Sequence, residues 1–83
     1  MDEVLAQLLP AVEEQLASPD TPYVAETYQR LLTHDDIDAE EAKNLIAFCL
    51  ADELEALERE ERPFNAERYQ TLLSLLPTMP EGR

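Results

Sequence analysis

Apolar residues recur at intervals of three and four along most of the chain, which is the spacing that gathers them on one face of an α-helix. The first such stripe predicts a helix over residues 2–17. Pro10 lies inside that helix and predicts either a kink or a break into two short helices, because proline removes a backbone hydrogen bond. Further stripes predict helices over 22–33, 39–60 and 66–76.

Residues that favour helix starts stand directly before three of these segments. Thr21 precedes Pro22, and proline is favoured at the first helical position. Asp38 and Asn65 precede the third and fourth segments, and both side chains are good acceptors for the free N–H groups of a first turn. We therefore predict N-caps at Thr21, Asp38 and Asn65.

The middle of the longest predicted helix, "LIAFCLA" over Leu45–Ala51, is apolar on every side. A helix that is apolar all round is buried all round. In so small a domain we expect the other helices to leave part of this segment uncovered. The pattern therefore predicts a homodimer.

The segment "AETYQRLL" at 25–32 returns as "AERYQTLL" at 66–73, an offset of 41 residues. The match extends backwards to Pro22 with Pro63 and to Tyr23 with Phe64. It predicts two similar helical hairpins, at about 2–33 and 38–76, in which Tyr28 and Tyr69 pack inward. Phe64 and Tyr69 flank Asn65, the N-cap of the fourth helix, at the two positions of a hydrophobic staple. We predict an all-α four-helix bundle with the third helix central, one domain over 1–77 and a flexible tail over 78–83.

The amino-acid composition excludes several kinds of site and segment. With a single glycine in 83 residues, at Gly82, the chain has no glycine-rich phosphate or dinucleotide loop. Its single cysteine, Cys49, cannot form an intrachain disulfide, and its apolar neighbours predict a buried, unreactive thiol. The N-terminus is acidic and its apolar stretch is interrupted, so we expect neither a signal peptide nor a membrane span. These features predict a cytoplasmic protein.

Negative charge is concentrated in one third of the chain. The formal charge is −13, and residues 35–61 hold eleven acidic and two basic residues. Direct binding to nucleic acid or to an anionic membrane is excluded, because phosphate contacts need Lys and Arg. We expect the acids of the third helix to face outward and to bind a protein partner through Asp52, Glu53, Glu55 and Glu58, and their charge favours a basic partner. An alternative is a DNA mimic that inhibits a basic DNA-binding protein.

The segment "HDDID" contains side chains that are candidate metal ligands. His34, Asp35 and Asp36 could bind a divalent metal, although the spacing does not match a calcium loop. A solvated loop before a helix cap is the interpretation that we favour. We predict no catalytic residues, no metal site and no cofactor, and hence a non-enzymatic interaction module.

The pattern "AVEEQLASPDTPYV…YQRLL…DAEEAKNLI…CLADEL…RPFNAERYQTLL" resembles a family of short bacterial all-helical proteins of unknown function. The likeness covers residues 9–76. Members of that family carry paired histidines that would suit a metal, and the matching positions here are Leu5, Leu9, Glu40 and Asn44. The resemblance therefore implies a compact bacterial helical domain and no metal site.

Overall fold

A computed structural model describes residues 3–78, and it confirms the all-α fold. Four helices follow one another along the chain, with ends close to those predicted: α1 (Glu3–Ala17), α2 (Pro22–Leu32), α3 (Ala39–Glu60) and α4 (Ala66–Leu75). The predicted helix start at residue 2 and most of the predicted tail, 79–83, lie outside the described residues.

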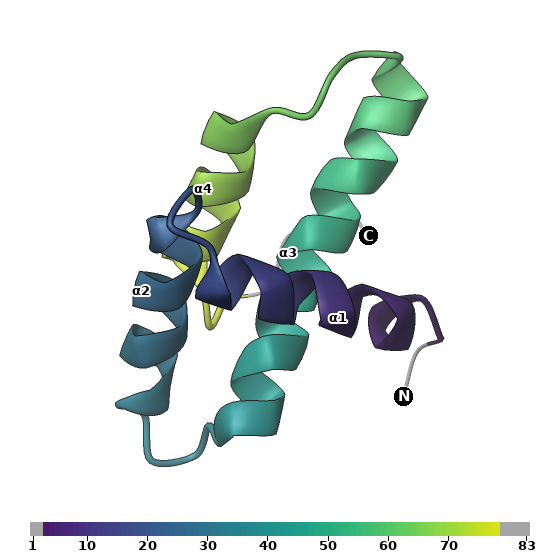
Figure 1. Cartoon of the computed structure of the whole chain (residues 1–83). Helices are drawn as coiled ribbons and strands as arrows, with labels where there is room; N and C mark the ends of the chain where they lie inside the picture. The colour runs from purple at the N-terminus through teal and green to yellow at the C-terminus, as the bar shows by residue number, and fades with distance from the viewer. Residues whose placement is uncertain (1–2, 79–83) are drawn as a thin grey trace.

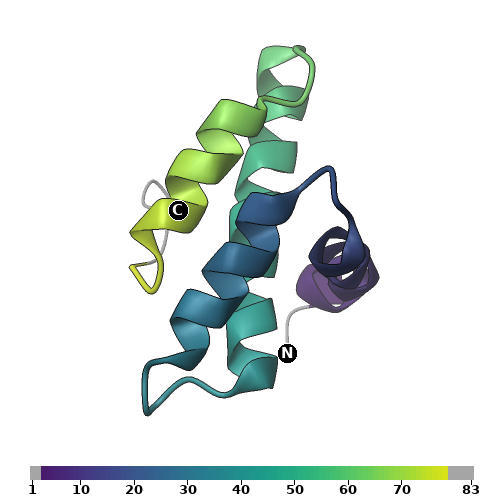
Figure 2. The same cartoon turned by 60° about the vertical axis from the view of Figure 1, so that its left-hand side comes forward.

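α3 is the central helix, as predicted: it contacts each of the other three helices, as α2 also does, and it contributes the most buried residues. α2 and α4 both run antiparallel to α3, with α2 beside its N-terminal half and α4 beside its C-terminal half (Figures 1 and 2). α1 crosses the middle of α3 at a steep angle (Figure 1). The two hairpins are therefore not related by a simple two-fold axis: α2 packs on α3, whereas the backbones of α1 and α4 do not meet.

Most of the apolar segment of α3 is covered by the other helices of the chain. Its side chains at Leu45, Ile46, Ala47, Cys49 and Leu50 are at most 8 % exposed. α1 covers one side of the segment by crossing it, while α2 and α4 cover another. Phe48 and Ala51 of the same segment are only half-buried, so part of it does stay uncovered, as expected. The homodimer stays a prediction.

Two of the three predicted N-caps are confirmed. Asp38 accepts a hydrogen bond from the Glu41 N–H at 2.8 Å, and Asn65 accepts one from the Arg68 N–H at 3.1 Å. Thr21 occupies the N-cap position of α2 but makes no side-chain cap. Its hydroxyl instead donates to the Gln15 carbonyl at 2.8 Å, which ties the start of α2 to the end of α1.

α1 continues through Pro10 without a break. Proline cannot donate the hydrogen bond that a helix would direct to the carbonyl four residues earlier. Pro10 is exposed. Because α1 is continuous over Glu3–Ala17, the alternative of two short helices in this segment is wrong.

Tyr69 joins the two copies of the repeat. It is fully buried, its ring meets that of Phe64 edge-to-face at 5.6 Å between centroids, and Tyr23 meets it in the same way at 6.1 Å. The predicted staple between Phe64 and Tyr69 is thus confirmed. The Tyr69 hydroxyl donates to the Gln15 side chain on α1 at 2.7 Å, so this polar tip is satisfied where it is buried. Tyr28, at the matching position of the first copy, is half-buried.

Candidate binding surface between α1 and α3

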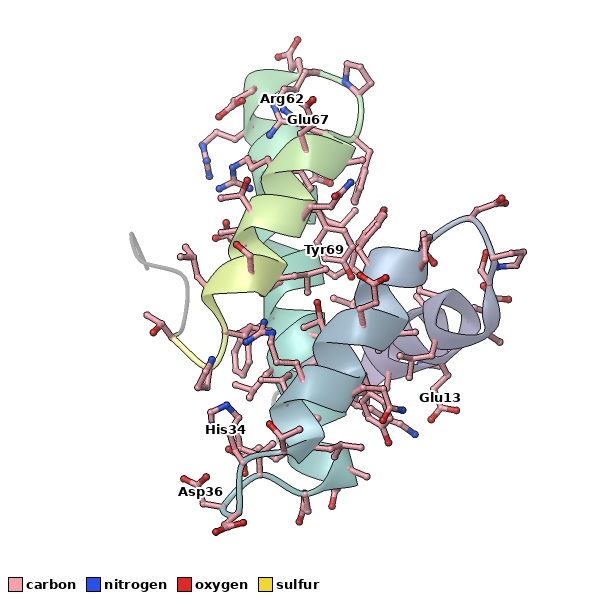
Figure 3. The ribbon with its side chains drawn as sticks, turned by 90° about the vertical axis from the view of Figure 1, so that its left-hand side faces the viewer. Glu13, His34, Asp36, Arg62, Glu67 and Tyr69 are labelled. Atoms are coloured by element: carbon pink, nitrogen blue, oxygen red, sulfur yellow. The ribbon has the colours of Figure 1, made fainter. Side chains whose placement is uncertain are left out.

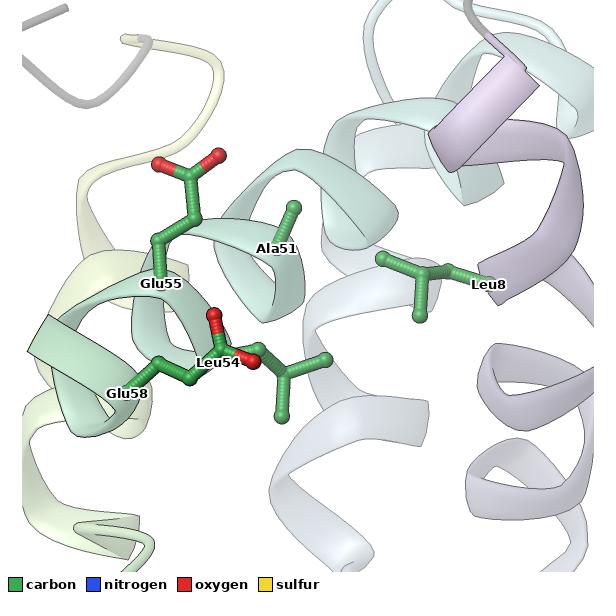
Figure 4. A pocket seen from close by; sticks show the side chains of 5 residues that line it. All are labelled: Leu8, Ala51, Leu54, Glu55 and Glu58. Carbon is green, nitrogen blue, oxygen red and sulfur yellow. The ribbon is translucent and has the colours of Figure 1, made fainter. Parts of the chain in front are cut away.

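The four acids predicted to bind a partner separate into two groups. Asp52 and Glu53 turn toward α4 and its preceding loop, where they bind arginines. Glu55 and Glu58 are exposed on the side of α3 that is next to α1 (Figure 4). Only the second group offers carboxylates to an approaching protein.

Glu53 is fully buried, so the expectation that it lies on the outer face of α3 is wrong. Its carboxylate accepts hydrogen bonds from Arg62 at 2.7 and 3.2 Å, from Arg68 at 2.9 Å and from the Asn65 backbone N–H at 2.7 Å. These bonds, that of Arg62 above all, lower the pKa of Glu53 to about 2. Glu53 thus holds the α3–α4 connection and is not available to a partner.

Asp52 belongs to the same cluster. Its carboxylate accepts a hydrogen bond from Arg68 at 2.7 Å, and its side chain is 11 % exposed. A single guanidinium therefore joins Asp52 and Glu53, and it connects α3 to the first turn of α4. Asp52 contributes to this connection rather than to an open acidic face.

Glu55 and Glu58 border a small apolar hollow between α1 and α3. Leu8 of α1 faces Ala51 and Leu54 of α3, and the two carboxylates rise on the α3 side (Figure 4). The hollow has a volume of about 130 Å³, and its three apolar side chains are half-exposed. Arg59, one turn after Glu55, approaches Glu60 at 3.8 Å.

Leu8 and Leu54 belong to the apolar stripes of their helices, and those stripes did not predict this hollow. The stripes on α1 and α3 are both correct as helix faces, but the crossing of the two helices lets them separate toward the C-terminal half of α3. No signal in the sequence sets that crossing, because side-chain periodicity defines a face and not the angle at which two faces meet.

A second depression, of about 350 Å³, lies between α2 and α4 and includes Arg30. The guanidinium of Arg30 donates to the carbonyls of Leu73 and Leu76, at 2.8 Å each. Leu73 is in the last turn of α4, where its carbonyl also accepts from the Leu76 N–H at 3.2 Å, and Leu76 directly follows the helix. Arg30 is thus occupied in closing α4.

His34, Asp35 and Asp36 lie exposed in the loop between α2 and α3, at the end of the molecule opposite Arg62 (Figure 3). Across residues 3–78, no three His, Cys, Asp or Glu side chains come together in a way that could hold a metal ion. The metal-binding alternative stays a prediction.

Cys49 is fully buried, as predicted. Burial first, and the nearby charge of Asp52 second, raise the pKa of the Cys49 thiol to about 12. The thiolate is the reactive form of cysteine, so this thiol is unreactive in the folded protein.

Comparison with protein-family models, with curated proteins and with solved structures finds no match to this chain. The resemblance to short bacterial helical proteins stays a prediction. Within residues 3–78, no helix is long and apolar enough to cross a membrane.

Proposed function

We propose that this protein is a non-enzymatic binding module whose partner is a protein with a basic segment. The observation that carries the proposal is the combination on one surface of an apolar hollow, formed by Leu8, Ala51 and Leu54, and two exposed carboxylates, Glu55 and Glu58. Apolar contact supplies binding energy, and charge complementarity supplies steering and selectivity. We call these five residues the α1–α3 groove.

The side chains with the strongest potential chemistry lie outside the α1–α3 groove. Cys49 and Tyr69 are buried in the core, and His34 is exposed in a loop at one end of the molecule. A nucleophile needs a base within hydrogen-bonding reach, and acid–base work needs a pocket around the reacting group. This distribution supports a binding role over catalysis.

The DNA-mimic alternative needs a continuous line of free carboxylates. At the C-terminal end of α3 that line is interrupted: Glu53 is buried, and Glu60 pairs with Arg62 at 2.6 Å. No observation favours this alternative.

A cytoplasmic location is part of the proposal, because the single cysteine is buried as a free thiol and the fold needs no disulfide.

The test is affinity capture with matched variants. Bait protein carrying Glu55→Gln with Glu58→Gln should lose a partner that the natural chain retains, and the loss should be reproduced with the identified partner after purification. The control carries Glu14→Gln with Glu40→Gln, two exposed acids outside the groove, and so has the same total charge. Retained binding in the first variant, or equal loss in both, would contradict the proposal.

A further inference from the structure

The α1–α3 groove is too small for a metabolite or cofactor. Its volume is about 130 Å³, whereas small-molecule sites usually hold roughly 300–1,000 Å³. A space of this size admits one aliphatic side chain. The floor is apolar and the polar groups stand on one edge only, so the fitting group is an apolar side chain with positive charge beside it.

We propose that the occupant is a basic amphipathic α-helix of the partner, which inserts one Leu-sized side chain between Leu8, Ala51 and Leu54. This inference rests on the proposed function and names the chemistry of the partner. Lys or Arg residues one turn away on that helix would reach Glu55 and Glu58. The two carboxylates are three residues apart on α3 and therefore share one face, about one helical turn long.

The other modes of peptide binding need structural features that this surface does not have. Adding a strand requires an open sheet edge, and residues 3–78 contain no strand. Polyproline segments bind between aromatic side chains, and the groove is lined by Leu8, Ala51, Leu54 and two glutamates. Phosphorylated or acidic segments need arginine clusters, and here the charge is negative. A helix laid into the groove is the mode that remains.

A second copy of this chain does not fit the same surface. In a symmetric dimer whose two-fold axis passes through the groove, Glu55 and Glu58 would face the same carboxylates across the interface. Like charges brought together in this way oppose association, and the net charge of −13 adds to the repulsion. The groove therefore favours a basic partner over self-association.

The experiment uses synthetic peptides of about 18 residues, long enough to form helices on binding. The first peptide contains only Leu, Lys and Ala, with the leucines on one face. The second has the same composition with the leucines spread around the helix, and the third has a central proline in the first sequence. Binding is followed by backbone amide shifts of isotope-labelled protein, which also locate the contact.

The first peptide should bind about tenfold more tightly than the other two, with shifts centred on the α1–α3 groove. Ala51→Leu should weaken that binding by about tenfold by filling the hollow, and Ala51 is half-exposed, so the fold should tolerate it. Equal binding of all three peptides, shifts elsewhere, no binding by the first peptide, or full binding by Ala51→Leu would overturn the helical occupant. None of these outcomes decides the capture test. A partner lost through Glu55→Gln with Glu58→Gln would still support the proposed function.

Discussion

Arg62 donates two hydrogen bonds, at 2.7 and 3.2 Å, to the carboxylate of Glu53, which lies nine residues earlier in the chain. The carboxylate is fully buried, while the arginine side chain is 23 % exposed. The cation thus closes the outer side of the site and neutralises a charge that could not be buried alone. Together with Arg68 and the Asn65 N–H, this pair sets the path of the chain from α3 into α4.

We expect Glu53→Gln to lower the free energy of unfolding by roughly 2–3 kcal/mol, because it removes the buried charge to which both arginines donate, and Arg62 and Arg68 then keep only Glu60 and Asp52. Urea denaturation at neutral pH measures the change. Glu55→Gln, on the same helix but exposed, should alter stability by no more than about 0.5 kcal/mol. Equal stability of the Glu53 variant and the natural chain would show that the buried cluster does not stabilise the fold.

The same carboxylate predicts a loss of stability in acid. Its pKa is lowered from 4.5 to about 2 in the folded protein, chiefly by the hydrogen bond from Arg62. The folded protein therefore binds fewer protons here than the unfolded chain does, and the contribution of Glu53 is fully present above about pH 4.5. It is lost as the pH falls from there toward 2.

Other acids also titrate in this range, so the informative quantity is the stability difference between the natural chain and Glu53→Gln. Urea denaturation at pH 7, 4.5 and 3 should show that difference shrinking mainly between the last two values. A difference that is constant down to pH 3 would contradict the lowered pKa.

The periodicity of α3 held a signal for the burial of Glu53. The residue lies four positions after Cys49 and three after Leu50, and it therefore continues the buried stripe of the helix. The prediction instead placed Glu53 outward, because acids are rarely buried without a partner. The partners, Arg62 and Arg68, follow on the loop and on α4, and only the return of α4 along α3 brings them to the same point.

Local features were predictable and the tertiary arrangement was less so. Asp38 and Asn65 were identified as caps because capping depends on residues within one turn. The burial of Cys49 followed from its apolar neighbours. The groove at Leu8 was not predicted, because it depends on how α1 crosses α3, and residue spacing does not determine a crossing angle.

Glu61 ends α3 in a left-handed conformation, with φ 52° and ψ 52°, and its N–H donates to the Leu57 carbonyl. That conformation is costly for a residue with a Cβ atom and is natural for glycine at a helix end. We expect Glu61→Gly to raise the free energy of unfolding by roughly 0.5–1 kcal/mol. Glu58→Gly, inside the same helix, should lower it by about 1 kcal/mol. Thermal or urea unfolding tests both signs, and destabilisation by Glu61→Gly would contradict the strain.

Arg30 of α2 closes the C-terminal end of α4 from across the bundle, by donating to the carbonyls of Leu73 and Leu76 at 2.8 Å each. A cation at this end also complements the helix dipole. We expect Arg30→Ala to cost about 1–2 kcal/mol of stability and to speed amide hydrogen exchange in α4 more than in α1. Arg59→Ala removes an exposed arginine whose 3.8 Å pair with Glu60 is long, and it should leave exchange in α4 unchanged. Uniform acceleration along the chain in Arg30→Ala would mean that Arg30 stabilises the bundle as a whole rather than the end of α4.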